Sequence, residues 1–451
     1  MPEAPKTRDG AAHRDRLRKQ MARIAADVWK RASSERSVTV ISSPPGAGKT
    51  STLIEIVGLV LKARRRVGVA CQTNAQAEDV CTRLVKVLGS GRVTRFISST
   101  ASPDPPCDGC LVASKADAIE DGPHVVVGTA AKWALIEKAP EVDLIIVDEA
   151  WQMALSTFLP LLRFCDRFVL IGDPGQIPPV VSAATERWET SRNPPHRAAP
   201  DVLIERLELK PISLPATWRL PFDTARLIRD FYEFDFESAA LAGERTLEFK
   251  KVRGEAGAAD RALDRLARGS IARLVVPMPS AGGLVANDPD VAAAAAEVVG
   301  RALDRVATFT ARDDENPAPR RLEPTDIGIA ATHRVLVQAI ATRLPARYRD
   351  QVKVDTAERW QGLQRELMVV VHPLSSMVNP GEFDLETGRL CVMASRHRSG
   401  LVVVGREHIG ATLEGILPVA SQPLGQPDAF ARGLKRHRAF WHHLESSEAT
   451  A

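Results

Sequence analysis

The sequence predicts an α/β fold made of two lobes of similar size. In two separate parts of the chain, short apolar or β-branched runs alternate with helical stretches, a pattern typical of parallel sheets flanked by helices. With 451 residues, 44% of them hydrophobic, each lobe can bury its own core. The runs of the first part are Val38–Ile41, Val67–Ala70, Val125–Val127, Leu144–Val147 and Phe168–Ile171. The runs of the second part are Leu274–Pro277, Ile327–Ala330, Val352–Val354, Leu367–Val371 and Leu401–Val404.

Changes in composition between these runs suggest the domain boundaries. The charged, Pro-containing stretch 311–321 is expected to be a surface loop. We expect five segments: a helical extension over 1–36, a first lobe over 37–224, a connector over 225–270, a second lobe over 271–417 and a tail over 418–451. In sheets of this kind, ligands bind beyond the carboxyl ends of the strands.

Charge and cysteine content bound the class of protein. The 60 basic and 56 acidic residues nearly cancel, so any basic surface for a nucleic acid must be local. No apolar run approaches the ~18 residues that span a bilayer, and the N-terminus lacks a signal-peptide core. We therefore expect a cytoplasmic protein without a membrane partner, with its cysteines as free thiols. Cys107 and Cys110 form a lone CxxC pair, which favours an ordinary loop over a zinc site with its four ligands.

A phosphate-binding loop follows the first strand of the first lobe. The segment Ser43–Thr50 reads SPPGAGKT and leads into a helical stretch, the strand–loop–helix context of a P-loop. Its glycines let backbone N–H groups surround phosphate oxygens, Lys49 reaches the β- and γ-phosphates, and Thr50 binds Mg²⁺. Ser43 stands where the motif has its first glycine. The nucleotide-binding residues expected here are Gly46, Ala47, Gly48, Lys49, Thr50 and Ser51.

Two acidic residues follow the apolar run Leu144–Val147. Asp148 is expected to hold Mg²⁺ together with Thr50, and Glu149 to orient and deprotonate the attacking water. The next strand ends in a segment that contains Gln176. We expect its amide to lie beside the γ-phosphate or the attacking water.

The order of the motifs resembles that of superfamily 1 helicases, in particular the nonsense-mediated-decay (Upf-like, superfamily 1B) branch. The resemblance covers residues 37–405 and implies two RecA-like P-loop NTPase lobes in tandem that use ATP and Mg²⁺, in a compact form without large inserted subdomains. The segments that carry it are Ser43–Thr50, Cys71–Glu78, Val127–Thr129, Asp148–Gln152, Gly172–Val180, Leu214–Arg219, Ile327–Ile340, Val354–Gly362 and Leu390–Arg398.

The resemblance also assigns roles to Arg219, in the final segment of the first lobe, and to residues of the second lobe. Arg396 matches the arginine finger, and Arg219 matches a second phosphate arginine. Gln361 and Gly362 match nucleotide-binding positions, whereas Gln364 stands where the family has a ribose-binding glutamate. Further departures are His333 and Leu336, which replace a tyrosine and a glutamine. Gln20 is either an adenine contact or a surface glutamine.

A single strand of nucleic acid is the partner that the resemblance implies. Hydroxyls and amides at strand ends contact phosphates without reading sequence, so binding should depend strongly on salt. Trp133 and Trp360 either stack on bases or pack in the core, and the core is favoured for Trp360. The residues expected to contact the strand are Thr73, Asn74, Thr129, His333 and Thr356.

The predicted function is an ATP-dependent helicase or single-strand translocase, moving 5′ to 3′ on DNA or RNA by analogy with the family. The alternative is a nucleic-acid-stimulated ATPase switch or clamp without unwinding. Only 67 residues, 81–147, separate two of the motif-bearing elements, too few for an extra barrel as well as the sheet. A binding module without turnover is disfavoured because Lys49, Asp148, Glu149 and both arginines are intact.

Overall fold

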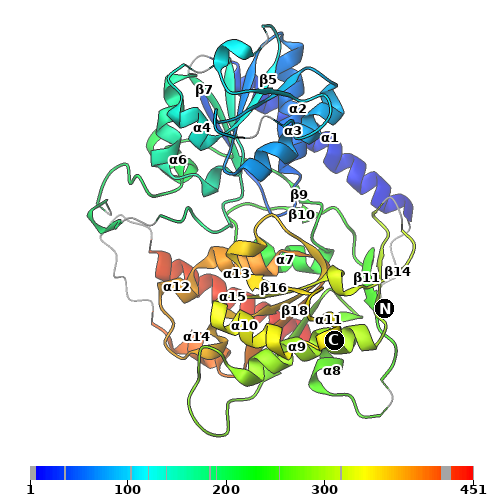
Figure 1. Ribbon diagram of the computed structural model, residues 1–451. Helices are drawn as coiled ribbons and strands as arrows, with labels where there is room; N and C mark the ends of the chain where they lie inside the picture. Colours follow the sequence, from blue (N-terminus) through cyan, green and yellow to red (C-terminus); the bar gives the residue numbers. More distant parts are fainter. Residues whose placement is uncertain are drawn as a thin grey trace. The chain divides into compact units, whose positions relative to one another are not determined.

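The computed structural model contains two compact units (Figure 1). The N-terminal unit comprises Arg16–Pro174 and Pro178–Pro215. The C-terminal unit comprises residues 7–15, Gly175–Ile177 and the described residues from 216 onwards. None of the described helices is long and apolar enough to cross a membrane. The structure describes residues 7–34, 37–101, 104–119, 121–138, 140–181, 184–188, 190–252, 254–314, 317–417 and 428–449, so parts of the expected tail 418–451 lie outside it.

The N-terminal unit is built on an eight-stranded sheet in the order β4-β3-β5-β2-β6-β7-β1-β8, with parallel pairing throughout. Its strands are β1 Ser37–Ser42, β2 Val67–Cys71, β3 Val93–Phe96, β4 Leu111–Ala113, β5 Val125–Thr129, β6 Leu144–Val147, β7 Arg167–Gly172 and β8 Ile212–Ser213. Its helices are α1 Thr7–Ala32, α2 Lys49–Lys62, α3 Asn74–Leu88, α4 Ala130–Leu135, α5 Leu155–Phe158 and α6 Ala199–Leu207. The first residues of α1, up to Asp15, belong to the C-terminal unit.

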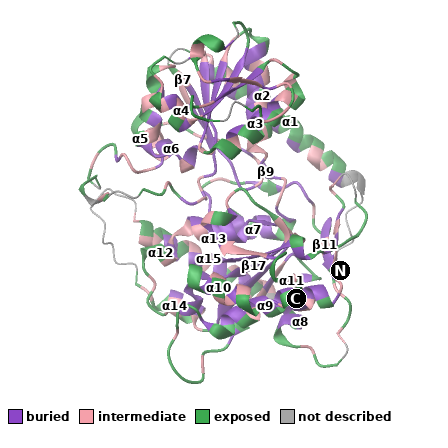
Figure 2. Cartoon of the chain, in the orientation of Figure 1, coloured by how far each residue is buried: buried purple, intermediate pink, exposed green. Residues whose placement is uncertain are grey.

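Helices cover both faces of this sheet. Along β2, Val67 and Val69 point to the face that packs against α1, α2 and α3, whereas Ala70 belongs to the core under α4, α5 and α6. Figure 1 shows α2 and α3 on one side of the strands and α4 and α6 on the other. Because each central strand is buried on both faces (Figure 2), it reads in the sequence as an unbroken apolar run.

The C-terminal unit contains a five-stranded parallel sheet in the order β12-β18-β17-β15-β16. Its strands are β12 Ile271–Val276, β15 Ile327–Ala331, β16 Lys353–Thr356, β17 Arg365–Val371 and β18 His397–Arg406. Its helices are α7 Phe222–Arg229, α8 Ala258–Leu266, α9 Pro289–Asp304, α10 Arg334–Arg343, α11 Ala346–Arg349, α12 Glu382–Leu385, α13 Thr387–Ala394, α14 Ile409–Gly415 and α15 Ala429–Ala449.

Two apolar cores enclose this second sheet. Val369 belongs to the core beneath α8, α9 and α10, and its neighbour Val370 belongs to the core beneath α7, α13 and α15. The α/β class with parallel sheets flanked by helices is therefore confirmed.

Two small sheets accompany the C-terminal unit. β9 Ala216–Thr217 pairs with β10 Glu237–Ser238. β11 Arg245–Glu248, β13 Thr308–Ala311 and β14 Arg320–Arg321 form an antiparallel sheet. The expected connector and the expected surface loop thus both contribute strands.

Candidate functional site

The phosphate-binding loop joins β1 to α2 at the carboxyl end of the parallel sheet. Gly46 and Gly48 have φ values of 71° and 81°, a left-handed conformation that glycine adopts without steric cost. α2 begins at Lys49, directly after this turn, so its free N–H groups and partial positive charge lie at the loop. Ala47 is buried, whereas Thr50 is half-buried and Ser51 is exposed.

Ser43 ties this loop to the neighbouring strand β7. Its backbone N–H and its hydroxyl both donate to the carbonyl oxygen of Gly172, at 2.9 and 2.7 Å. Gly172 itself leaves no space for a side chain, because a Cβ there would lie 2.8 Å from the backbone nitrogen of Ala150. The serine that replaces the usual glycine therefore contributes a buried hydrogen bond to the loop.

Lys49 and Glu149 meet at the end of the sheet. The ammonium nitrogen of Lys49 lies 2.8 Å from Oε2 of Glu149, and both side chains are mostly buried, at 13% and 20% exposure. Glu149 has a φ of 50°, an uncommon conformation for a residue with a side chain. Strained residues of this kind cluster at functional sites. The backbone N–H of Glu149 also donates to Oδ1 of Asp148 at 3.0 Å.

Asp148 is buried beside this pair. Burial and, second, the negative charge of Glu149 raise the pKa of Asp148 from 3.8 to about 7. A bound divalent cation would oppose both effects by favouring the charged form. Mg²⁺ takes oxygen ligands from one or two protein groups and completes its shell with phosphates and water. The hydroxyl of Thr50 and the carboxylate of Asp148 fit this requirement.

Gln176 is placed by a short segment that packs with the C-terminal unit. A Cβ on Gly175 would collide with the hydroxyl of Tyr232, and a Cβ on Gly388 would lie 2.6 Å from the carbonyl oxygen of Gln176. Ile177 is part of the apolar core of the same unit. Gln176 itself is half-buried.

Three expected nucleic-acid contacts lie at neighbouring strand ends of the N-terminal unit. β2 and β5 pair in parallel with Cys71 opposite Thr129. Thr73 caps α3 and Thr129 caps α4, each through a side-chain oxygen that accepts a backbone N–H. Oδ1 of Asn74 accepts a hydrogen bond of 2.8 Å from Arg95. Asn74 and Thr129 line one cavity of about 340 Å³, together with Phe96, Ser98 and Lys132.

The two contacts expected from the C-terminal unit lie at the ends of adjacent strands. Thr356 ends β16 opposite Ala331 of β15 and is 8% exposed. His333 precedes α10, and its Nε2 lies 3.5 Å from Oδ1 of Asp384. Gln361 and Gly362 follow Thr356 closely, and Gly362 has a φ of 76°.

Both predicted arginines belong to the C-terminal unit. Arg219 donates from Nε to Oε1 of Gln364 at 2.9 Å and from Nη1 to the carbonyl of Ser395 at 3.3 Å. Gln364, which stands where superfamily 1 helicases have a ribose-binding glutamate, thus accepts a hydrogen bond from Arg219. Arg396 is 2% exposed, and its Nε donates to the carbonyl of Val392 at 3.0 Å.

Both tryptophans considered for base stacking are buried. Trp133 and Trp360 are 0% exposed, and their indole nitrogens donate to the carbonyls of Val69 and Ile329 at 3.1 and 3.0 Å. The core interpretation is confirmed for Trp360. For Trp133, where the sequence left both roles open, the structure decides for the core.

His397 was not recognised in the sequence. It is completely buried next to Arg396, and burial, then the charges of Arg219 and Arg245, lower its pKa to about 3. The imidazole is therefore neutral at physiological pH. Arg245 itself lies in the expected connector, where no motif marks it.

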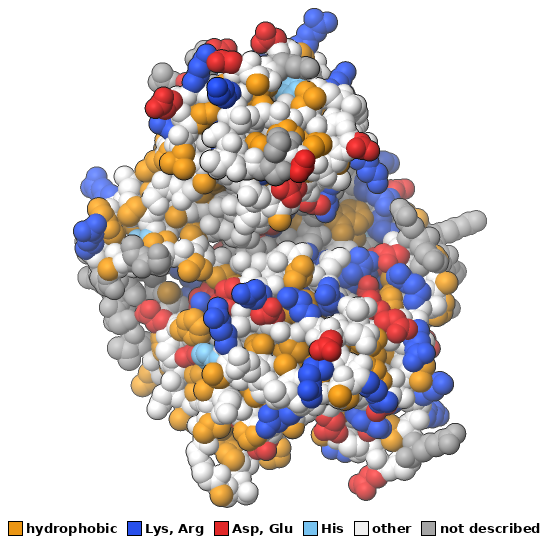
Figure 3. All heavy atoms as spheres, viewed as in Figure 1, with side chains coloured by type: hydrophobic (Ala, Val, Ile, Leu, Met, Phe, Trp, Pro, Cys, Tyr) orange, Lys and Arg blue, Asp and Glu red, His pale blue; other side chains and the backbone are white. Residues whose placement is uncertain are grey.

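The surface carries no single dominant charge in the view of Figure 3. Lysine and arginine side chains intermingle with acidic ones over the C-terminal unit, as expected from 60 basic and 56 acidic residues.

Comparisons with known proteins agree with the helicase resemblance. Residues 112–184 match a family described as an AAA domain. This stretch contains Asp148, Glu149 and Gln176. The chain is similar to ATP-dependent helicase/nucleases.

Among the relatives, the DNA replication ATP-dependent helicase/nuclease dna2 of Schizosaccharomyces pombe is 21% identical over 388 residues, which cover 83% of this chain and 27% of that protein. The helicase/nuclease JHS1 of Arabidopsis thaliana is 29% identical over 160 residues, covering 34% and 12%. The chain thus spans about a quarter or less of these relatives. A crystal structure of arterivirus nonstructural protein 10, a helicase, aligns with a TM-score of 0.44 at 14% identity, covering 84% of this chain and 61% of that one.

Proposed function

We propose that this chain is an ATP-driven nucleic-acid motor of superfamily 1, in its 1B (Upf-like) branch, that acts as a helicase or single-strand translocase moving 5′ to 3′. The first lobe, 37–224, carries the nucleotide, and the second lobe, 271–417, contributes the finger arginine. The observation that carries the proposal is the meeting of Lys49, Asp148 and Glu149 at the carboxyl end of one parallel sheet. P-loop ATPases place these groups at the same position.

The chemistry follows from these groups. Lys49 and the N–H groups at the start of α2 bind the β- and γ-phosphates of ATP. Because Glu149 lies within 2.8 Å of Lys49, a γ-phosphate bound by the lysine is within reach of a water held by the glutamate. Glu149 accepts a proton from that water while the water oxygen forms a bond to the γ-phosphorus. The bond to the bridging oxygen then breaks, and its electron pair leaves with ADP.

Thr50 and Asp148 would hold Mg²⁺, which would neutralise negative charge on the phosphates when bound. Arg396 and Arg219 supply further positive charge to the transferring phosphoryl group. An arginine in this role contributes a factor on the order of 10³–10⁵ in rate. Gln176 positions the attacking water or the γ-phosphate.

Single-stranded nucleic acid is the proposed track. The exposed Asn74 and the capping hydroxyls of Thr73 and Thr129 lie at adjacent strand ends, and His333 and Thr356 lie at adjacent ends in the C-terminal unit. Such groups contact the backbone without reading bases. DNA is the first strand to test, because the names of the relatives refer to DNA replication.

The test is the steady-state ATPase rate of the full chain with Mg²⁺, measured alone, with single-stranded DNA and with single-stranded RNA. We expect stimulation by at least one of them. Lys49→Ala should abolish nucleotide binding, and Glu149→Gln should bind ATP but turn over about 100-fold more slowly. Lys138→Ala, at an exposed lysine of the same unit, is the control. An unstimulated ATPase, or normal turnover in Glu149→Gln, contradicts the proposal.

An ATPase switch that does not unwind duplexes is a second candidate. The described residues between α3 and β6 build β3, β4, a short turn of 3₁₀ helix, β5 and α4, which belong to the sheet and its cover. No separate subdomain is built from the described residues of that stretch. A strand-displacement assay beside the ATPase assay distinguishes the two, since the switch hydrolyses ATP without releasing the displaced strand.

A further inference from the structure

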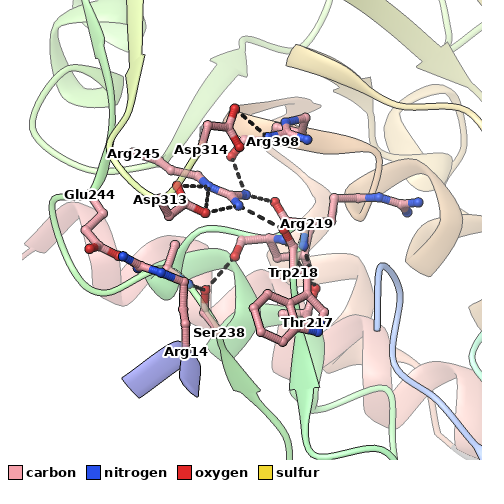
Figure 4. A network of polar contacts seen from close by, with 12 residues as sticks. Arg14, Thr217, Trp218, Arg219, Ser238, Glu244, Arg245, Asp313, Asp314 and Arg398 are labelled. Carbon is pink, nitrogen blue, oxygen red and sulfur yellow. Dashed lines mark hydrogen bonds and ion pairs between the residues drawn. The ribbon is translucent and has the colours of Figure 1, made fainter. Parts of the chain in front are cut away.

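One buried arginine of the C-terminal unit contacts both segments that carry the predicted phosphate arginines. These arginine-bearing segments are Leu214–Arg219 and Leu390–Arg398. Arg245 begins β11, in the expected connector. Its Nη2 donates to the carbonyl of Trp218 at 2.8 Å, and its Nη1 donates to the carbonyls of Arg219 and, at 3.2 Å, Arg398. In Figure 4 the guanidinium of Arg245 lies between the backbone of Trp218 and Arg219 and the carboxylate of Asp313.

The loop after β13 supplies two consecutive aspartates, and the first of them, Asp313, binds this guanidinium. Asp313 accepts from Nε of Arg245 at 2.9 and 3.1 Å and also pairs with its Nη2. The next residue, Asp314, accepts two bonds of 2.6 and 2.9 Å from Arg398. The antiparallel sheet β11–β13–β14 therefore supplies both the arginine and the carboxylates that hold the two segments.

Two separate sets of hydrogen bonds connect the two arginine-bearing segments. The segment with Arg219 is joined to the segment with Arg396 twice, once by the side chain of Arg219 on the carbonyl of Ser395 and once through Arg245. The Arg245 and Asp313 side chains are 2% and 5% exposed, so the pair is shielded from solvent. Other charged and titratable groups near this pair include Arg14, Asp314, Glu366, His397 and Arg398. Glu366 accepts a hydrogen bond of 2.7 Å from Ser399.

We propose that Arg245 is a positioning residue that fixes the geometry of Arg219 and Arg396 for phosphoryl transfer, with Asp313 orienting its guanidinium. This inference rests on the proposed ATPase function. A guanidinium presents five N–H donors in one rigid plane, so it can hold three carbonyls and a carboxylate at once. A lysine keeps the charge but offers a single donor atom, and it would lose most of these contacts.

The competing explanation is that Arg245 only stabilises the fold. Arg406 is a matched control for a purely structural role. It ends β18, whereas Arg398, whose carbonyl Arg245 contacts, lies near the start of that strand. It forms a bidentate pair of 2.7 and 2.6 Å with Asp288, its side chain is also 2% exposed, and it likewise donates to a backbone carbonyl, that of Pro277. It contacts neither arginine-bearing segment in any of these bonds.

The experiment compares the full-length wild type, Arg245→Lys and Arg406→Lys. We expect kcat for ATP to fall about tenfold or more in Arg245→Lys while KM changes less than about threefold, because a contact that matters in the transition state is lost. Arg406→Lys should stay within about twofold of the wild-type kcat. If Arg245→Lys fails to fold, Asp313→Asn replaces it, with a smaller loss expected because the carbonyl contacts remain.

Hydrogen exchange of the peptides covering 216–220 and 395–399 provides a readout that needs no turnover. Exchange there should be faster in Arg245→Lys than in wild type and unchanged in Arg406→Lys. A wild-type kcat in Arg245→Lys, or equal losses in both variants, overturns the inference. If the wild type itself lacks ATPase activity, the proposed function fails, and the exchange data alone decide whether Arg245 holds the two segments.

Discussion

Replacing Asp148 with asparagine should stabilise the protein while abolishing its activity. The structure raises the pKa of this carboxyl from 3.8 to about 7 through burial and the nearby charge of Glu149, so the ionised form is disfavoured in the folded state. A shift of roughly three pKa units corresponds to about 4 kcal/mol at most, at 1.36 kcal/mol per unit. Asparagine removes the charge and keeps the oxygen that accepts the backbone N–H of Glu149.

The sign of the pH dependence follows from proton binding. Between about pH 4 and pH 7, the folded state binds this proton and the unfolded state does not, so the free energy of unfolding falls as pH rises through that window. Above about pH 7 the carboxyl is ionised in both states, so the loss in the free energy of unfolding has reached its full size. Asp148→Asn should therefore gain about 2–4 kcal/mol at pH 8 and less than half of that gain at pH 5.

Urea unfolding of both proteins at pH 5 and pH 8, without nucleotide or Mg²⁺, measures these differences. The same variant should lose ATPase activity because Mg²⁺ loses its carboxylate ligand. Asp148→Asn that is destabilised to the same extent at both pH values would falsify the reasoning, since the ionised carboxylate would then be contributing stability rather than costing it.

Three further predictions concern Ser43, Trp133 and Asn74. Ser43→Ala should lower the free energy of unfolding by about 1 kcal/mol in a urea titration, because the buried hydroxyl bond to Gly172 is lost; an unchanged midpoint would show that the bond contributes nothing. Trp133→Ala should cost about 3–5 kcal/mol as a buried aromatic, and a variant of normal stability that no longer binds single strands would restore the stacking role. Asn74→Ala should weaken single-strand binding about fivefold without changing its salt dependence, because an amide releases no counterions; a changed salt slope in a fluorescence-anisotropy titration would contradict this.

The candidate nucleotide site could be proposed from the sequence because its parts are local. Ser43–Thr50 is contiguous, and Asp148 and Glu149 follow directly on a buried strand. Parallel strands bring their carboxyl ends to one edge, so the meeting of Lys49 with Glu149, 100 residues apart in the chain, could be expected from the pattern. The α/β class followed from the same apolar runs.

Other parts of the candidate site depend on contacts that no pattern announces. The role of Trp133 was undecided because an aromatic residue after a strand suits either a core or a stacking surface. Only its 0% exposure and the indole bond to Val69 assign it to the core. The fit of Ser43 likewise depends on the carbonyl of Gly172, 129 residues away.

The sequence by itself predicted the P-loop and the parallel strands around it, because short motifs and uninterrupted apolar runs encode both locally. Only the tertiary structure showed how Arg219 and the segment of Arg396 are held. That arrangement depends on Arg245, Asp313 and backbone carbonyls. Backbone carbonyls are common to all residues, and an ion pair between residues 68 positions apart leaves no periodic signal in the chain.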